Sequence, residues 1–271
     1  MAIFSRHNHN MHYLDVGKGP VLLFGHSYLW NSKMWAPQIE ALSQNYRCIV
    51  PDLWAHGESE ALPKQTTNLQ DYAADLLALM DHLEVEHFNI VGLSVGGMWG
   101  TELAMLAPQR VKSLVIMDTF IGLEPEITHQ RYFAMLDGIT AAKSVPAPIV
   151  EAVAPLFFAN DAKQDNPELV QGFESYLASL KGQAAVDVAR VGRIVFGRRD
   201  QFEEIENLAL PVLIMVGDQD KPRPVFESYL MQDAITGSEL VVIPNAGHIS
   251  NLEQPAFVTE KLTAFLEANA I

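Results

Sequence analysis

One stretch of the sequence decides the fold: Asn89-Ile90-Val91-Gly92-Leu93-Ser94-Val95-Gly96-Gly97. It begins as an apolar, strand-like run and leads, through a serine flanked by glycines, into a helical segment at 98–106 that ends near Pro108. A strand-to-helix reversal this tight strains the backbone at its apex, and side chains two residues before and after the apex would collide with neighbouring backbone. We therefore expect Ser94 to stand exposed above the edge of a sheet, at the positive end of a helix, as a nucleophile.

Around this stretch, short apolar runs alternate with helical patterns. The runs are apolar on both faces, as in strands of a covered parallel sheet, and lie at 21–24, 48–50, 89–91, 111–117, 212–216 and 240–243. Apolar residues recur at spacings of three and four in 69–83 and again after Pro255, which predicts amphipathic helices. The segments 11–16 and 20–24 flank Gly17-Lys18-Gly19 and predict an antiparallel pair joined by a glycine turn. The sequence thus predicts the α/β class: a doubly wound, mostly parallel sheet with antiparallel N-terminal strands.

Residues 120–206 interrupt the alternation, because no strong strand run occurs there. Clusters of aromatic and aliphatic side chains in this segment predict three or four helices inserted between two strands. We therefore predict a core formed by 1–119 and 207–271 and a helical cap formed by 120–206.

The composition excludes several classes of protein. The chain has 271 residues, and its 49% of hydrophobic residues are enough to bury a sizeable core. Lys and Arg number 18 against 33 Asp and Glu, a formal charge of -15, which argues against nucleic acid as a partner and weakly against anionic membranes. The N-terminus shows no signal-peptide pattern, and apolar runs such as 212–216 are far shorter than the ~20 residues that span a bilayer. We expect a cytoplasmic protein without membrane insertion.

Cysteine and histidine give no sign of a metal or redox centre. The single cysteine, Cys48, lies in an apolar run and is interpreted as a buried strand residue, because no turn or base signature marks it as a nucleophile. His7, His9 and His12 are close in sequence but have no acidic or cysteine partner nearby, so a polar hairpin is favoured over a metal site. The chain has no glycine-rich phosphate loop either. We expect neither metal nor cofactor.

A serine nucleophile needs a base, and the base needs a carboxylate. His248 is the histidine that follows the last strand-like run, in a loop where Gly247 allows the chain to fold back. Three aspartates follow predicted strands at the edge where α/β sites assemble: Asp220 is favoured, Asp218 is second and Asp118 third.

The order of these motifs resembles that of the α/β-hydrolase fold superfamily, and most of all its capped bacterial esterases and lactonases. The motifs are Gly25-His26, Asp52…His56-Gly57…Ser59, Gly92-Leu93-Ser94-Val95-Gly96-Gly97, Gly217-Asp218-Gln219-Asp220 and Ala246-Gly247-His248. The resemblance implies that Ser94 is the nucleophile, Asp220, the last residue of the Gly-x-x-Asp turn, the acid, and His248 the base. It also implies that the inserted helices roof the pocket. A serine at the strand-to-helix turn disfavours dehalogenase and epoxide hydrolase chemistry, which in this superfamily uses an aspartate at that position.

Acyl transfer also needs N–H donors for the developing oxyanion. We predict the backbone N–H groups of Val95 and His26. The sequence departs from the family here, with Phe24-Gly25-His26 in place of the usual His-Gly. The His26 side chain has two open roles, stabilising the loop or binding substrate, and the first is favoured.

A second departure puts Trp54-Ala55 where the family usually has Arg-Gly, and a structural role is favoured for it. Bulky side chains near the predicted site suggest a pocket wall. The candidate pocket residues are Tyr28, Trp30, Trp54, Phe133 and Phe157.

These features predict a serine hydrolase that cleaves small to medium, uncharged carboxylic esters through an acyl-serine intermediate. Lactone, thioester and C–C bond hydrolysis by the same residues stay open. A small-molecule receptor on the same fold is the alternative of another class, and an inert scaffold is disfavoured by the intact Ser, Asp and His order. The expected partner is a small ester-like molecule, and the sequence leaves the oligomeric state open.

Overall fold

The computed structural model describes residues 2–271 and contains one eight-stranded sheet with the order β1-β2-β4-β3-β5-β6-β7-β8. The six strands from β4 to β8 in this order are parallel, whereas β1 and β2 are antiparallel to their neighbours. This confirms the predicted α/β class and the antiparallel N-terminal strands. The strands are β1 (Ala2–Arg6), β2 (His9–Val16), β3 (Val21–Gly25), β4 (Arg47–Pro51), β5 (Phe88–Leu93), β6 (Val111–Met117), β7 (Val212–Gly217) and β8 (Glu239–Ile243).

The N-terminal pairing differs from the prediction in one respect. The predicted hairpin partners, β2 and β3, are not neighbours, because β4 lies between them. β2 pairs instead with β1 and with β4, and the β1–β2 pair is the polar hairpin expected around His7, His9 and His12. The glycine turn at 17–19 therefore carries the chain across β4, which buries β3 between two parallel strands.

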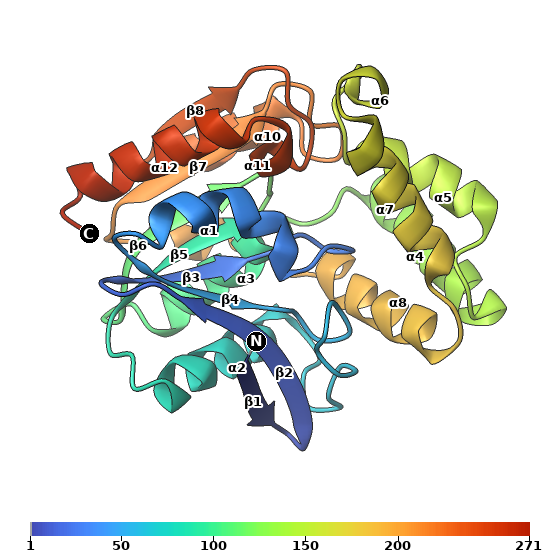
Figure 1. Ribbon diagram of the computed structural model, residues 1–271, viewed down its shortest axis with the longest axis horizontal. Helices are drawn as coiled ribbons and strands as arrows, with labels where there is room; N and C mark the ends of the chain where they lie inside the picture. Colours follow the sequence, from blue (N-terminus) through green and yellow to red (C-terminus); the bar gives the residue numbers. More distant parts are fainter. Residues whose placement is uncertain (1) are drawn as a thin grey trace.

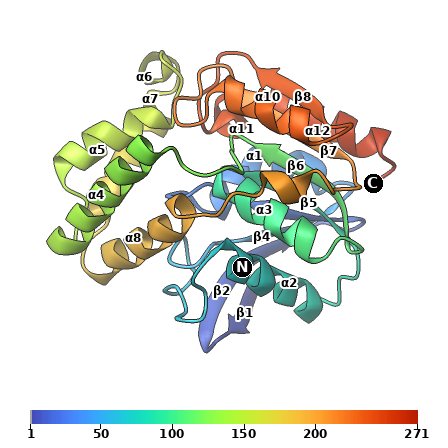
Figure 2. The ribbon, with the colours of Figure 1, turned by 180° about the vertical axis from the view of Figure 1, so that it is seen from behind.

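Helices cover both faces of the sheet: α1, α11 and α12 lie on one face, and α2, α3 and α10 on the other (Figures 1 and 2). None of the helices formed by residues 2–271 combines the length and the apolar character needed to cross a bilayer. The helices on the faces are η1 (Ser32–Trp35), α1 (Ala36–Leu42), α2 (Leu69–His82), α3 (Val95–Leu106), α10 (Val225–Ala234), α11 (Ser250–Glu253) and α12 (Pro255–Ala268).

The segment between β6 and β7 contains further helices, which lie beside the sheet at the carboxyl ends of its parallel strands (Figure 1). Four longer helices, α4, α5, α7 and α8, match the predicted three or four. The short helices α6 and α9 have four residues each, too few to produce a periodic pattern. The predicted division of the chain at 120 and 206 stays a prediction. The helices are α4 (Glu126–Ala142), α5 (Ala147–Val153), η2 (Ala154–Leu156), α6 (Ala162–Asp165), α7 (Pro167–Ser179), α8 (Gln183–Phe196) and α9 (Phe202–Ile205).

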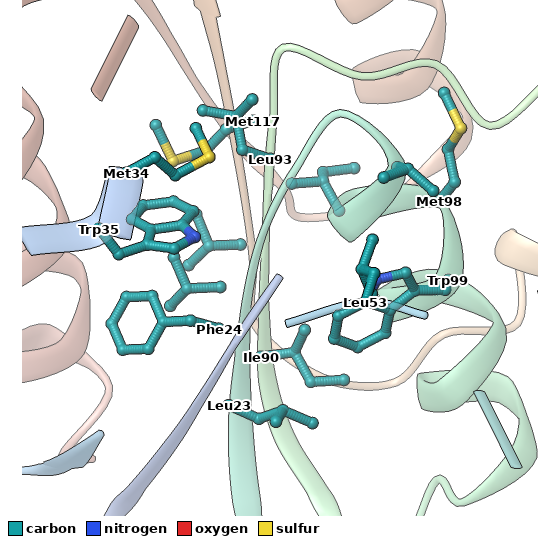
Figure 3. Close-up of a cluster of buried hydrophobic side chains, with 14 of the residues drawn as sticks. Leu23, Phe24, Met34, Trp35, Leu53, Ile90, Leu93, Met98, Trp99 and Met117 are labelled. Carbon is teal, nitrogen blue, oxygen red and sulfur yellow. The ribbon is translucent and has the colours of Figure 1, made fainter. Parts of the chain in front are cut away.

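The core lies on both faces of the central strands. Figure 3 shows Phe24 with Trp35 on one face and Ile90 with Trp99 on the other, and all four side chains are fully buried. Because successive residues of a strand point to opposite faces, a central strand must be apolar throughout to face two layers of helices. This is the physical reason why the runs of β3 and β5 could be recognised in the sequence.

Two groups of residues lie away from the carboxyl ends of the strands. Cys48 is fully buried in β4, and burial raises the pKa of its thiol to about 12. His7, His9 and His12 lie in the β1–β2 hairpin, where His7 Nε2 is 3.0 Å from a carboxylate oxygen of Asp75. Within residues 2–271, no three or more His, Cys, Asp and Glu side chains are placed to hold a metal ion together.

Candidate active site

Ser94 occupies the turn between β5 and α3 with φ 57° and ψ −119°. A positive φ is costly for a residue with a Cβ atom, and such strain persists only where the surroundings impose it. Two hydrogen bonds hold the turn: the Ser94 N–H donates to the carbonyl of Met117 at 2.8 Å, and the Thr119 hydroxyl donates to the Ser94 carbonyl at 2.7 Å. The turn is thus fixed to the end of β6, and Ser94 is held in the strained conformation that the sequence predicts.

Gly92 and Gly96, on either side of Ser94, have no room for a side chain because backbone atoms of neighbouring segments lie too close to them. A Cβ atom on Gly92 would lie 2.2 Å from the carbonyl oxygen of Gly96. A Cβ atom on Gly96 would lie 2.2 Å from the carbonyl oxygen of Gly25, at the end of β3. The glycine spacing therefore reflects the packing of α3 against β5 and β3.

A chain of hydrogen bonds connects Ser94 to residues far away in sequence. His248 Nε2 lies 2.9 Å from Ser94 Oγ, and His248 Nδ1 lies 2.9 Å from Asp220 Oδ2. Asp220 follows β7 and His248 follows β8, so parallel strands bring both to the sheet edge that carries Ser94. With the Nδ1 proton donated to Asp220, Nε2 is left free to accept the serine proton.

The other two candidate aspartates have different contacts. Asp218 is exposed, and its carboxylate accepts the N–H of Ala246 at 3.3 Å. Asp118 is fully buried and accepts hydrogen bonds from the Gly217 N–H and the Ser250 hydroxyl. Burial, together with the nearby charge of Asp220, raises the pKa of Asp118 well above its usual value. Of the three, Asp220 is the aspartate in contact with His248.

The loop after β3 carries backbone N–H groups beside Ser94. Most of them are used: Ser27 N–H contacts Met34 Sδ at 3.4 Å, Leu29 N–H donates to His56 Nε2 at 3.1 Å, and Trp30 N–H donates to the Ser27 carbonyl. Among residues 2–271, the N–H groups of His26 and Tyr28 have no acceptor. The N–H of Val95 has none within its helix, because Val95 is the first residue of α3.

The His26 side chain stabilises this loop. It is fully buried, its Nδ1 donates to the Ser27 carbonyl at 2.8 Å, and its Nε2 accepts the N–H of Leu53 at 2.8 Å. Of the two roles considered for this side chain, the structure therefore favours the stabilising one. Burial lowers the pKa of His26, which keeps the ring neutral and Nε2 able to accept.

A cavity opens from Ser94 and His248 into the inserted helices. Of the five predicted pocket residues, Tyr28 and Phe157 line it. Trp30, Trp54 and Phe133 do not, and packing explains each case. Trp30 stacks on Phe173 at 4.8 Å, Trp54 is fully buried with its Nε1 donating to Asp75, and Phe133 stacks on His129 at 4.1 Å.

One wall of the cavity contains a buried ion-pair cluster that the sequence did not suggest. Arg223 lines the cavity and binds both carboxylate oxygens of Glu124, at 2.6 and 2.7 Å. Arg198 also pairs with Glu124, and Arg223 lies 3.4 Å from Glu227. The backbone N–H of Arg223 donates to Asp220 Oδ1 at 2.9 Å, which ties the cluster to the acid. No motif marks these residues, because three distant segments supply them.

The comparison with protein families places this site in a known fold. A family profile described as the alpha/beta hydrolase fold matches residues 20–255. The chain belongs to this family. Its curated relatives include 3-oxoadipate enol-lactonase 2 of Acinetobacter baylyi, which is 28% identical over 252 residues, 92% of this chain and 89% of the relative. An uncharacterised carboxylesterase of Bacillus subtilis is 27% identical over 254 residues, 92% of this chain and 80% of the relative.

A solved structure agrees with this assignment. A thermophilic esterase from Thermogutta terrifontis superimposes with a TM-score of 0.88 and 27% identity, covering 96% of this chain and 94% of the esterase. This α/β-hydrolase is accordingly similar, along most of its length, to proteins named as esterases and lactonases. The similarity supports hydrolase activity.

Proposed function

We propose that this α/β-hydrolase is a serine hydrolase of uncharged carboxylic esters, with Ser94, His248 and Asp220 as its catalytic residues. The observation that carries the proposal is the hydrogen-bonded chain from Ser94 Oγ through both nitrogens of His248 to Asp220, with 2.9 Å at each contact. Both distances lie within the range needed for proton transfer and for orienting the base.

The proposed reaction has two halves. Ser94 Oγ attacks the ester carbonyl carbon while His248 Nε2 takes its proton, and Asp220 stabilises the imidazolium that results. The tetrahedral intermediate collapses as His248 donates that proton to the leaving alcohol, which leaves an acyl group on Ser94. Water, deprotonated by His248, attacks the acyl-serine, and the second tetrahedral intermediate releases the carboxylic acid and restores the serine hydroxyl.

We propose the N–H groups of Val95 and Tyr28 as the oxyanion donors. The sequence suggested His26 in place of Tyr28, a prediction that no observation tests directly. Tyr28 is favoured because it lines the cavity with Ser94, whereas His26 does not. Each such donor typically lowers the barrier by about 3 kcal/mol, since it meets charge that develops only in the transition state.

The inserted helices, 120–206 in the sequence prediction, are proposed to be the cap of the site. This is supported by the cavity, because most of its lining side chains come from this segment. Lactones are the second candidate substrates, since a relative is named an enol-lactonase and ring opening needs the same residues.

The proposal is tested with a panel of esters, lactones and thioesters. Ser94→Ala and His248→Ala are each expected to abolish turnover, and the double variant is expected to be no worse than either single one. Asp220→Asn should lower kcat by about 10⁴, and the matched change of a neighbouring, exposed carboxylate, Asp218→Asn, should have little effect.

A fluorophosphonate probe with mass spectrometry locates the nucleophile independently of the substrate. Labelling of Ser94 that is lost in His248→Ala is the expected result. Full turnover by Ser94→Ala would refute the proposal. A single slow cycle with retained product would favour a receptor.

A further inference from the structure

The cavity continues well beyond the residues proposed to act on the ester. Its lining includes Tyr132 and Leu136 of α4, Ile149 of α5, Leu177 of α7 and Ala185 of α8. We call the part lined by residues between 135 and 196 the insertion chamber. The ligand of this chamber specifies the substrate of the proposed ester hydrolase, so the inference rests on that proposed function.

The insertion chamber is apolar throughout. Every side chain that lines the cavity from Met135 to Phe196 is aliphatic, aromatic or a methionine. The polar and charged lining groups lie outside 135–196. They include Tyr132 of α4, and also Ser94, His248 and Arg223, which lie along the chain of hydrogen bonds that starts at Ser94. A substrate therefore meets polar groups at its ester and apolar groups along the rest of its length.

The lining of the chamber extends along α8. Along α8, the lining residues run from Phe196 to Ala185, which at a rise of 1.5 Å per residue is about 16 Å. Figures 1 and 2 show that the Phe196 end of α8 lies next to the sheet and that the Gln183 end points away from it. Ala185 therefore lies at the end of the α8 lining that points away from the sheet.

Backbone hydrogen bonds join the segments at this far end. Val145, which lines the cavity, donates its N–H to the Leu180 carbonyl at 3.3 Å, and Gly182 donates to the Lys143 carbonyl at 2.7 Å. Ser144 and Lys181 form an antiparallel bridge between the two hydrogen bonds. The connection between α4 and α5 is thereby tied to the connection between α7 and α8, beside Val145 of the cavity lining.

The charges around the cavity argue against substrates whose chain carries a carboxylate. Arg223 is the cationic side chain that lines the cavity, and the carboxylates of Glu124 and Glu227 already face it. Together with Arg198, these form a cluster of two guanidinium and two carboxyl groups, in which burial raises the pKa of Glu227 to about 7. A carboxylate carried into the apolar end of the chamber would find no counter-ion there and would lose its hydration.

We infer that the insertion chamber binds one unbranched, uncharged aliphatic chain of medium length, attached to the ester that Ser94 attacks, with Ala185 setting the length limit. A zigzag of ~1.5 Å carbon–carbon bonds advances about 1.3 Å per carbon, so ~16 Å admits a chain of about twelve carbons at most. Octanoyl and decanoyl esters match the chamber, whereas palmitoyl esters exceed it.

The first measurement compares two series of esters. Nitrophenyl esters from acetate to palmitate vary the acyl chain, and alkyl acetates from methyl to hexadecyl vary the alcohol. In the series whose variable chain enters the chamber, kcat/KM is expected to rise by up to about fourfold per methylene. It should reach a maximum at chains of eight to ten carbons, as in octanoate and decanoate, and then fall. A terminal carboxylate on the chain should cost at least about tenfold. Two flat series, or an optimum at acetate, would overturn the inference.

The second measurement tests whether side chains at position 185 change the preferred chain length. Ala185→Val, Ala185→Leu and Ala185→Phe fill the far end in steps and should shift the optimum to progressively shorter chains. For Ala185→Phe we expect a loss of tenfold or more on decanoate and a change of less than twofold on butyrate. Ala184→Phe is the matched control, because Ala184 is the exposed neighbour on the same helix, and its length profile should equal that of the wild type. An unshifted optimum in Ala185→Val, the smallest change, would refute the assignment even if the larger variants do not fold.

A binding assay separates this inference from the proposed reaction. n-Decanol should raise the unfolding temperature of the wild type and of Ser94→Ala, and raise it less in Ala185→Leu. If no ester is hydrolysed but this pattern holds, the proposed reaction fails while the assignment of the chamber stands. If esters are hydrolysed and n-decanol has no effect on any variant, the assignment of the chamber fails alone.

Discussion

Replacing His56 tests how the loop that carries Tyr28 is held in place. The His56 ring is buried, its Nδ1 donates to the Trp54 carbonyl at 2.9 Å, and its Nε2 accepts the N–H of Leu29 at 3.1 Å. The His26 ring lies 5.5 Å away. Both hydrogen bonds require a neutral ring with its proton on Nδ1, since a protonated Nε2 cannot accept.

The surroundings determine the pH dependence of this contact. Burial, followed by the neighbouring His26, lowers the pKa of His56 to about 3, from about 6.5 for an unperturbed histidine. Between pH 6.5 and 3 the unfolded chain therefore binds a proton at this position that the folded protein does not bind. Stability must then fall as the pH decreases through this range. From pH 6.5 to pH 4, a difference of 2.5 pH units at 1.36 kcal/mol each corresponds to about 3 kcal/mol.

Two variants separate the titration of His56 from its hydrogen bond. In His56→Phe the buried N–H of Leu29 loses its acceptor, so at pH 8 the variant should be about 1–3 kcal/mol less stable than the wild type. At pH 4 this deficit should vanish or reverse, because only the wild type has lost the contribution of His56. His56→Gln offers another acceptor that does not titrate, so it should be less destabilised at pH 8, and position 56 should likewise contribute nothing to its acid sensitivity.

Urea unfolding followed by tryptophan fluorescence at pH 8 and pH 4 measures these free energies. His26 titrates in the same direction, so some acid sensitivity should persist in both variants. The reasoning is refuted if the free-energy difference between wild type and His56→Phe is the same at both pH values.

Three further changes test close contacts around the site. Gly192→Ala should lower kcat and, in a thermal unfolding assay, destabilise the fold by about 1–3 kcal/mol, because its Cβ atom would lie 2.6 Å from the Tyr28 hydroxyl. The matched control is Gly172→Ala, on a helix face with nothing within 4 Å of an added Cβ atom. It should be neutral or stabilising in the same assay. Ser94→Gly should abolish turnover yet raise the free energy of unfolding by about 1 kcal/mol or more, since glycine relieves the positive φ; a less stable variant would contradict the strain. Glu124→Gln should cost about 3–5 kcal/mol in urea unfolding, because it leaves two buried guanidinium groups without their shared carboxylate, and an unchanged midpoint would show that the cluster is not needed.

The sequence predicted the parts of the fold whose signals are local. Apolar runs reveal strands buried on both faces, and the glycine spacing around Ser94 reveals the turn that packs against β3. His248 could be placed because it follows the last strand, and parallel strands bring their carboxyl ends to one edge. Asp220 was favoured over Asp218 by its place in the turn, and the contact with His248 now distinguishes them.

Other features depend on contacts between distant segments, and the sequence does not encode these in any pattern. The connection 17–19 looks like a hairpin turn, but only the tertiary fold shows that β4 enters between the two strands. Aromatic residues near the site were candidates for the pocket wall, yet Trp30 stacks on Phe173 outside the cavity. Trp54, for which a structural role was favoured, donates a buried hydrogen bond to Asp75. Size and position in the sequence do not tell which face of a loop a ring occupies.

The contacts of Tyr28 connect the two proposals. Its backbone N–H is a proposed oxyanion donor, while its hydroxyl donates to the Val188 carbonyl of α8 at 3.0 Å and its ring packs against Phe196 at 5.7 Å. Val188 and Phe196 also line the insertion chamber. A chain that fills the chamber therefore presses on the same helix that positions the loop, so that binding energy gained far from the ester is available to align the donor. Tyr28→Phe keeps the ring and removes only the hydroxyl, so it should lower kcat on decanoate more than on acetate. An equal loss on both esters would mean that the chamber and the oxyanion loop act independently.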